Sequence, residues 1–369
     1  MADERYLPID IMRGITMAAM VLVNTPGSWA HIYPQLRHSA WHGCTIADLV
    51  FPSFLFVAGL SMAFSFSRRG MERKARLARI GRRVAIIFVA GLFINAYPFQ
   101  AGPGDIRIMG VLQRIALAWG LAAVGAVFIR RKGLAILSVG ILIAYWIAVS
   151  WFGGSDPWSL EGNLVRHVDL LVLGERHMWS GFGIPFDPEG ILSTLPAVVS
   201  VIAGYIAGGP AASAMAESRQ SGIMVIPGLL LMAAGLLWGT VQPVSKPLWT
   251  GSYVLLTAGI SILMMSAIVW ITEVKRWRRW GWPASVFGAN PLLLFLISAL
   301  WVRTISGLVR FGASDVGSGK VSLYNFLYDS VFRPVAGEMN GSLLFAVFHL
   351  ILYWLMLYFL HRGRVFVKA

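Results

Sequence analysis

Long apolar runs follow one another along the whole chain, separated by shorter polar or charged segments. Runs of about 17 to 25 apolar residues have the length that an α-helix needs to cross a bilayer. The pattern predicts ten such helices, over residues 7–24, 45–66, 84–99, 108–129, 134–152, 191–208, 222–240, 248–272, 284–302 and 341–361. Since the sequence has no internal repeat and no low-complexity linker, we expect an all-α polytopic membrane protein with one transmembrane domain over residues 1–369.

Composition supports a membrane protein and excludes the soluble fold classes. Apolar residues make up 57% of the chain and charged residues only 13%, about half the usual share of charge, and the mean hydropathy is +0.68. The net charge of +14 would indicate nucleic acid in a soluble protein, but in a membrane protein it reports topology, so we expect no nucleic-acid partner. The single cysteine, Cys44, cannot form an internal disulfide, and no Cys/His spacing indicates a metal.

The basic residues are distributed unequally between the two sets of connections. The N-terminus, the even-numbered connections and the C-terminus together hold 21 Lys and Arg, against nine in the intervening connections. The positive-inside rule therefore predicts that both termini are cytoplasmic. The long outer connections, 25–44, 153–190 and 303–340, carry five of the seven histidines. Because long ordered loops often carry function, we expect the chemistry on the outer side.

The first span contains polar residues near both of its ends. Asp10 and Arg13 are three residues apart and hence on one helix face near the cytoplasmic end. Charges at this depth are functional candidates, although an ion pair at the membrane interface is an equally good interpretation. Asn24 closes the span on the outer side, as a functional residue or as a helix C-cap.

The outer segment that leads into the second span combines histidine with an embedded carboxylate. His38 precedes Asp48, which would lie about one turn inside the membrane. A carboxylate beside an imidazole fixes its tautomer and stabilises the imidazolium, as general-base chemistry requires. Alternatively, Thr45 and Asp48 have the spacing of a helix-capping box. Cys44 could carry an acyl group, but a small residue at a helix start is the more ordinary interpretation.

Three further features are candidates for binding an anionic ligand. Arg114 lies inside the fourth span and needs an anionic partner, either Asp10, Asp48 or a phosphate-bearing ligand. The stretch 68–83, which includes Arg82 and Arg83, holds eight positive residues and is either a topology signal or a dock for a polyanionic cytoplasmic cofactor. Asn290 precedes a proline near the start of the ninth span, where a bend could line a cavity.

Several polar blocks occur together in a specific order. They are LPIDIMRG at 7–14, VN at 23–24, His38 with Trp41, TIADLVFP at 45–52, RIMGVLQR at 107–114, DPEGIL at 187–192, KPLWTGSY at 246–253 and GANP at 288–291. In sequence and spacing, this set resembles the heparan-alpha-glucosaminide N-acetyltransferase family, membrane enzymes that move acetyl from cytoplasmic acetyl-CoA to an amino sugar across the bilayer. The resemblance extends over nearly the whole chain.

The resemblance implies roles for particular residues. His38 matches the family's essential histidine and Asn24 an asparagine beside it, with Asp48 orienting the imidazole. Apart from the resemblance, cations on or facing the cytoplasmic entrance are expected to attract the phosphates of the donor, and the expected donor site comprises Asp10, Arg13, Arg82, Arg83, Arg114 and Asn290. The acceptor would be held by Trp41, His42, Asp187 and Glu189. The family's Trp-Asn-Gly reads Trp-His-Gly at 41–43 here, which leaves the acceptor open.

The implied function is an acetyl-CoA-dependent N-acetyltransferase with a hexosamine acceptor on the outer side. The lysosomal members' extra lumenal domain and additional span have no counterpart before the shared core, so we expect a minimal multi-pass enzyme of the bacterial inner membrane. Its partners would be acetyl-CoA, the amino sugar, membrane lipid and, as an open option, a second copy in a homodimer. Direct transfer is favoured over an acetyl-histidine intermediate, which sequence alone does not decide.

Two other functions fit the same residues. A proton-coupled secondary transporter would use the embedded Asp and Arg residues as a relay and the outer loops as gates. An O-acyltransferase would modify hydroxyl groups of a surface polysaccharide instead of amines. Formation of an acetylated product from a thioester separates an enzyme from a transporter, and the acceptor's chemistry separates the two enzymes.

The basic-residue bias generates a prediction on sidedness. A single cysteine introduced at Arg73 should be reached by an impermeant thiol reagent only from the cytoplasm, and one at His177 only from outside, in a background without Cys44. Accessibility is measured on intact and on permeabilised cells. Labelling of the Arg73 position in intact cells would overturn the orientation.

Overall fold

The computed structural model describes residues 6–66, 71–100, 102–216, 222–312 and 320–367. In its first half the helices are α1 (Leu7–Asn24), α2 (Ile46–Phe66), α3 (Arg73–Ala96), α4 (Val111–Phe128), α5 (Arg131–Phe152), α6 (Leu164–Leu173) and α7 (Thr194–Ala216). In its second half they are α8 (Val225–Trp238), α9 (Gly251–Val269), α10 (Trp282–Ala289), α11 (Pro291–Arg303), α12 (Leu323–Leu327) and α13 (Arg333–Arg362). The strands β1 (Arg310–Gly312) and β2 (Lys320–Ser322) pair antiparallel, so a short hairpin adds to the expected all-α fold.

Within these described ranges, eight helical segments are long and apolar enough to cross a membrane, which supports a polytopic membrane protein. The expected spans 84–99 and 222–240 correspond to α3 and α8. Of these two, α3 begins in a charged stretch and α8 has only 14 residues. The expected span 284–302 is divided into α10 and α11 at Asn290. The predicted number of ten spans is therefore not established, although a helix forms at each predicted place.

The basic stretch expected as a connection is largely helical. Residues from Arg73 onward form the first turns of α3, while Arg68 and Arg69 lie outside the described residues. Arginine and lysine are good helix formers, and their long side chains can lie along apolar surface. The guanidinium of Arg76 lies 4.8 Å from the ring centre of Phe66, and that of Arg73 lies 5.4 Å from Phe128. These arginine side chains thus lie against aromatic rings, so a charged first part of α3 is compatible with a position at the membrane interface.

Close helix contacts in the centre depend on small residues. A Cβ atom added at Gly59 of α2 would lie 1.9 Å from the carbonyl oxygen of Val201 in α7, and one added at Gly204 would lie 1.9 Å from that of Phe56. The α2 and α7 backbones therefore touch at two successive turns, as small residues permit in membrane proteins. This contact fixes the depth of α2, whose first turn carries Asp48.

The break between α10 and α11 is held by the C-terminal segment. Asn290 is fully buried, and its side-chain Nδ2 donates to the carbonyl oxygen of Val365 at 3.0 Å while its Oδ1 accepts from the backbone N–H of Val367 at 2.9 Å. Pro291 then starts α11. Since both polar atoms of its amide bond to the chain itself, these contacts give Asn290 a structural role, and the expectation that it binds a cofactor stays a prediction.

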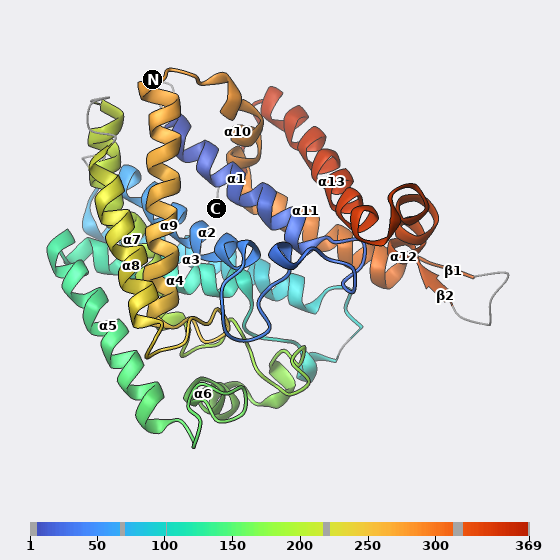
Figure 1. Ribbon diagram of the computed structural model, residues 1–369, viewed down its shortest axis with the longest axis horizontal. Helices are drawn as coiled ribbons and strands as arrows, with labels where there is room; N and C mark the ends of the chain where they lie inside the picture. The colour runs from blue at the N-terminus through green and yellow to red at the C-terminus, as the bar shows by residue number, and fades with distance from the viewer. Residues whose placement is uncertain (1–5, 67–70, 101, 217–221, 313–319, 368–369) are drawn as a thin grey trace.

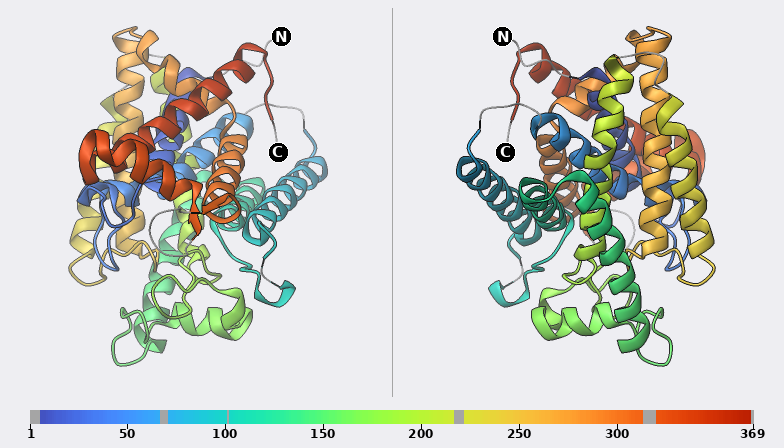
Figure 2. Two further views of the ribbon diagram at one scale, coloured as in Figure 1. Left: turned by 90° about the vertical axis from the view of Figure 1, so that its right-hand side faces the viewer. Right: turned by 90° about the vertical axis from the view of Figure 1, so that its left-hand side faces the viewer.

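The molecule has two distinguishable ends (Figures 1 and 2). The start of α1 lies toward one end, as do α10 and the end of α13, whereas α6 and the loops around it form a lobe at the opposite end. α1 and α2 lie between them in the interior. The fold thus places the N-terminal polar groups of α1 far from the loop that carries His38.

The α2–α7 contact gives a prediction on stability. Gly204→Val should lower the thermal unfolding temperature strongly, because an overpacked backbone contact costs typically ~1–3 kcal/mol or more. Gly140→Val is the matched control, because a Cβ at Gly140 in α5 meets nothing within 4 Å. The measurement is thermal unfolding of the purified proteins in one detergent. Equal unfolding temperatures for the two variants would contradict the close contact.

Candidate functional site

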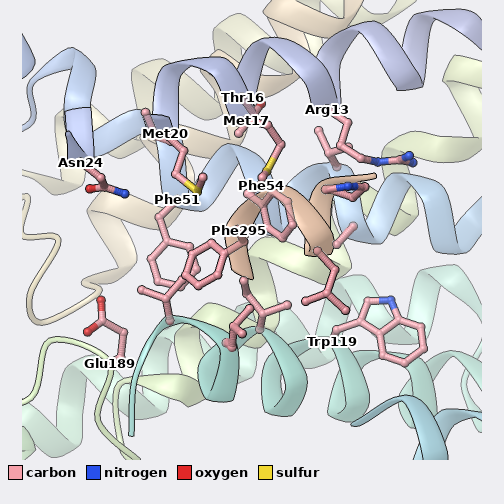
Figure 3. Close-up of a pocket in the computed structure, with 18 of the residues that line it drawn as sticks. Arg13, Thr16, Met17, Met20, Asn24, Phe51, Phe54, Trp119, Glu189 and Phe295 are labelled. Atoms are coloured by element: carbon pink, nitrogen blue, oxygen red, sulfur yellow. The ribbon is translucent and has the colours of Figure 1, made fainter. Parts of the chain in front are cut away.

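One cavity of about 1060 Å³ runs through the interior between α1, α2, α4 and α11. In Figure 3, Asn24 and Glu189 lie at one end of it and Arg13 and Trp119 at the other. We name these the outer end and the inner end after the sidedness that the sequence predicts, which stays a prediction. The section between them is lined by apolar side chains, among them Met17, Met20, Phe51, Phe54 and Phe295. Since Arg13 and Asn24 are eleven residues apart on α1, a helical rise of ~1.5 Å per residue separates them by about 16 Å.

His38 and Asp48 form the centre of the outer end. The Nδ1 atom of His38 lies 2.8 Å from Oδ1 of Asp48, and the Asp48 side chain is fully buried. The other oxygen, Oδ2, accepts from the backbone N–H of Ser39 and Thr45, both at 3.0 Å, and from Thr45 Oγ1 at 3.1 Å. The two sequence interpretations of Asp48, as a cap and as a partner of His38, therefore hold together.

This geometry fixes the tautomer of His38. An ionised carboxylate only accepts hydrogen bonds, so at 2.8 Å the His38 Nδ1 atom must carry the proton and donate it. In the neutral imidazole, Nε2 is then the acceptor. Because the His38 side chain lines the cavity and is 38% exposed, its Nε2 lone pair is available to a ligand.

Lys246 is a member of this end that the sequence did not single out. Its Nζ lies 3.0 Å from Nδ1 and 3.2 Å from Nε2 of His38, and 3.6 Å from Oδ1 of Asp48. Burial lowers the pKa of the Lys246 ammonium, although the charges of Asp48 and Glu189 oppose that shift. Two features of the sequence could have indicated Lys246. It is a cation in a connection predicted to lie on the outer side, where Lys and Arg are fewer, and it belongs to the KPLWTGSY block.

Arg107 is the second residue missed. It donates from Nε to Asp187 Oδ2 at 2.9 Å and from Nη2 to Asp187 Oδ1 and Glu189 Oε2, both at 2.6 Å. Burial alone would lower the pKa of Arg107, but the bonds to Asp187 and the charge of Glu189 outweigh it and raise this pKa. Arg107 and Glu189 line the cavity, whereas Asp187 is fully buried behind them and positions Arg107.

Of the four residues expected to bind the acceptor, Glu189 lines the cavity, whereas Trp41, His42 and Asp187 do not. Trp41 donates from Nε1 to the carbonyl oxygen of Trp158 at 2.6 Å and packs edge-on against Phe182, with ring centres 5.4 Å apart. Neither Trp41 nor His42 lines the cavity, whereas Trp179 and Phe182 do. Trp41 therefore supports the wall that these two rings form.

Asn24 is placed as expected, at the outer end of the cavity. It is the last residue of α1, and Thr25 is the C-cap. Its side chain is exposed, lines the cavity and forms no hydrogen bond with another residue of the described chain. Its amide is thus available to a ligand.

At the inner end, Arg13 holds several elements together. Its Nη1 donates to Asp10 at 3.1 Å and to the carbonyl oxygen of Gly288 at 2.9 Å, and its Nη2 donates to Ser61 Oγ at 2.7 Å. Arg83 lies 4.3 Å from the ring centre of Trp119 and also lines the cavity. Its described neighbours in the basic stretch, from Arg73 to Arg82, do not.

Arg114 and Cys44 are two further candidates from the sequence. Arg114 is fully buried outside the cavity lining, donates to Gly190 and Ser193, and lies 5.0 Å from the ring centre of Trp249. Its Nε and Nη1 atoms have no hydrogen-bond partner among the described residues, and the carboxylates near it are Glu189, Asp187 and Asp169 rather than Asp10 or Asp48. A role of Arg114 in binding the donor stays a prediction. Burial and the neighbouring Asp48 charge raise the pKa of the Cys44 thiol to about 12, which suppresses the nucleophilic thiolate.

Within the described ranges, no group of three or more His, Cys, Asp or Glu residues is arranged to hold a metal ion. The outer end instead offers a proton acceptor, a free amide and paired charges. This is a set suited to transfer of an acyl group to an amine or hydroxyl.

The helices and the cavity define the class of the protein. It is a membrane protein with many helices, in which one cavity joins a basic end to an end that holds a histidine–carboxylate pair. The family model described as "Heparan-alpha-glucosaminide N-acetyltransferase, catalytic" matches residues 5–213. The chain therefore belongs to this family. The matched part includes Asn24, His38, Asp48, Arg107 and Glu189, whereas Lys246 lies beyond it.

Two similar proteins carry the name heparan-alpha-glucosaminide N-acetyltransferase. The protein from Homo sapiens is 26% identical over 353 residues, which covers 79% of this chain and 52% of the human protein. The one from Mus musculus is 25% identical over 353 residues, covering 79% and 53%. The chain spans about half the length of these two relatives.

Proposed function

We propose that this protein is an N-acetyltransferase that moves acetyl from cytoplasmic acetyl-CoA to the amino group of a hexosamine on the outer side of a bacterial inner membrane. The observation that carries the proposal is one continuous cavity, which reaches both Arg13 at the inner end and His38 at the outer end. Membership in the acetyltransferase family supports the reaction class.

The inner end suits the donor's anionic part. Acetyl-CoA does not cross a bilayer, but its pantetheine arm is long enough, on the order of half a bilayer, to bring the thioester to a site in the interior. Arg83 and Arg13 offer guanidinium groups at this end, which match phosphate geometry. The apolar section lined by Phe51, Phe54 and Phe295 then accommodates the arm.

The outer end suits the chemistry. His38 Nε2 takes the proton from the acceptor amine as the nitrogen attacks the thioester carbonyl, while Asp48 stabilises the imidazolium through Nδ1–H. The amide of Asn24 donates to the oxyanion of the tetrahedral intermediate. As the C–S bond breaks, the proton on His38 passes to the leaving thiolate. Transfer is direct, without an acetyl-histidine intermediate.

The acceptor's binding site lies beside Glu189. Its carboxylate faces the cavity and is fixed by Arg107, so it can accept hydrogen bonds from sugar hydroxyls or from the ammonium form of the amine. Trp179, which is 39% exposed, and Phe182 present rings on which the apolar face of a sugar can stack. Trp41 packs against Phe182, and Asp187 positions Arg107, without lining the cavity themselves.

The assay that tests the function uses purified protein, acetyl-CoA and a panel of hexosamines. Acetylated hexosamine is the expected product. Acetylation of hydroxyls on a polysaccharide alone would identify an O-acyltransferase. Absence of any acetylated product from a protein that moves a solute across vesicles would identify a transporter.

Removing the base should abolish turnover. His38→Ala should lower kcat by ~10²–10⁴-fold, as expected for loss of a general base, and Asn24→Ala by ~10²–10³-fold, as for loss of one oxyanion donor. CoA binding, at the inner end, should be largely retained. His42→Ala is the control and should be milder, because His42 does not line the cavity. A folded His38→Ala protein with the wild-type rate would place the chemistry elsewhere.

The donor end has its own matched pair of variants. Arg83→Ala should raise the KM for acetyl-CoA about tenfold, because a charge-assisted hydrogen bond to phosphate is lost. Arg82→Ala should leave it unchanged, since this neighbour does not line the cavity. Steady-state kinetics at two salt concentrations measures both. Equal KM values for the two variants would assign the basic stretch to topology only.

A further inference from the structure

Lys246 is fixed in the site by its own loop. The loop between α8 and α9 is tied to the His38 loop, because Gly43 N–H donates to the Val244 carbonyl oxygen at 2.7 Å and Ser245 Oγ donates to that of Trp41 at 3.0 Å. The Lys246 side chain is 15% exposed and lines the cavity. Its Nζ is therefore held beside His38 by two connections distant in sequence.

Nζ of Lys246 is the amine of the described chain that lies against the base. With Nδ1–H donated in a hydrogen bond to Asp48, Nε2 of His38 is the nitrogen that accepts a proton. Lys246 Nζ is 3.2 Å from Nε2 and 3.0 Å from Nδ1, so it lies against the imidazole ring, and rotation of the flexible lysine side chain brings it onto the axis of the Nε2 lone pair. An acceptor amine must reach the same lone pair within hydrogen-bond distance to be deprotonated. The lowered pKa of Lys246 also enlarges the neutral, nucleophilic fraction of this amine.

We propose that Lys246 is itself an acetyl acceptor, and that without amino sugar the protein acetylates the Nζ of Lys246 from acetyl-CoA. This inference rests on the proposed function. The Nζ–C bond forms as the C–S bond of the thioester breaks. One proton of Nζ passes to His38 Nε2 and then to the leaving thiolate, so the products are acetyl-lysine and free CoA.

Self-acetylation changes the outer end. It removes the positive charge beside Asp48 and Glu189 and places a neutral amide against His38. The modified enzyme is therefore inactive toward external amines. A bound acceptor occupies the Nε2 lone pair and thereby protects Lys246, so modification follows the ratio of donor to acceptor.

The experiment incubates the purified full-length protein with isotopically labelled acetyl-CoA, without and with saturating glucosamine, and maps acetyl-lysine by mass spectrometry. The chain has six lysines. We expect label at Lys246, reduced at least tenfold by glucosamine. Lys275 and Lys320, both exposed, measure uncatalysed acetylation and should be unaffected by the sugar.

Two variants separate catalysed labelling from background and from misfolding. His38→Ala should reduce labelling at Lys246 by ~10²-fold or more, while Lys275 and Lys320 remain labelled to the wild-type extent. Lys246→Gln, which resembles acetyl-lysine, should have low turnover, whereas Lys246→Arg retains the cation, takes no label at this position and should be inactivated less by preincubation with the donor.

The outcomes distinguish the inference from the proposed function. Acetylated glucosamine without label at Lys246, or label that is equal in His38→Ala, overturns the inference and leaves the function standing. Absence of both products overturns the function and the inference with it. Label at Lys246 that depends on His38 and is suppressed by glucosamine supports both.

Discussion

The buried carboxylate of Asp48 is the group on which the outer end of the molecule depends. A fully buried charge costs several kcal/mol unless it is compensated by hydrogen bonds. Ser39, Thr45 and His38 supply that compensation, and the Asp48 carbonyl oxygen accepts from the Tyr253 hydroxyl at 2.5 Å. Satisfying this carboxylate thus folds the 37–45 loop onto the start of α2 and sets the tautomer of the histidine, while the separate bond from Tyr253 to the Asp48 backbone joins α2 to α9.

The rest of the fold determines where that group lies relative to the other end of the cavity. The close approach of α2 and α7 at Gly59 and Gly204 leaves no freedom for α2 to slide. At the inner end, Arg13 joins α1 to α2 and to the end of α10 through Ser61 and the Gly288 carbonyl oxygen. The distance between the two polar ends is therefore set by rigid helices rather than by loops, as positioning of two substrates requires.

Local signals in the sequence were sufficient for much of this arrangement. The pairs Asp10–Arg13 and His38–Asp48 are confirmed as contacts, because partners one helical turn apart, or joined by a short loop, are brought together by local geometry. Lys246 was not predicted to contact His38, because 208 residues separate them and no periodicity reports which loops meet. Arg114 was assigned to the donor site because an embedded arginine requires an anionic partner. In the structure it lies outside the cavity lining and donates to Gly190 and Ser193, while its Nε and Nη1 atoms have no hydrogen-bond partner among the described residues, so that assignment stays a prediction.

The apolar middle section of the cavity has a consequence for the membrane itself. A passage that connects polar groups on both sides of a bilayer would leak protons and ions if water filled it continuously. Hydrophobic constrictions tend to dewet, and a dry gap is a high electrostatic barrier to a charged species. The rings of Phe51, Phe54 and Phe295, with Met17 and Met20, line an apolar section of the cavity between Arg13 and Asn24. In the proposed function these side chains have two tasks, because they accommodate the uncharged arm of the donor and also oppose the passage of ions along the cavity.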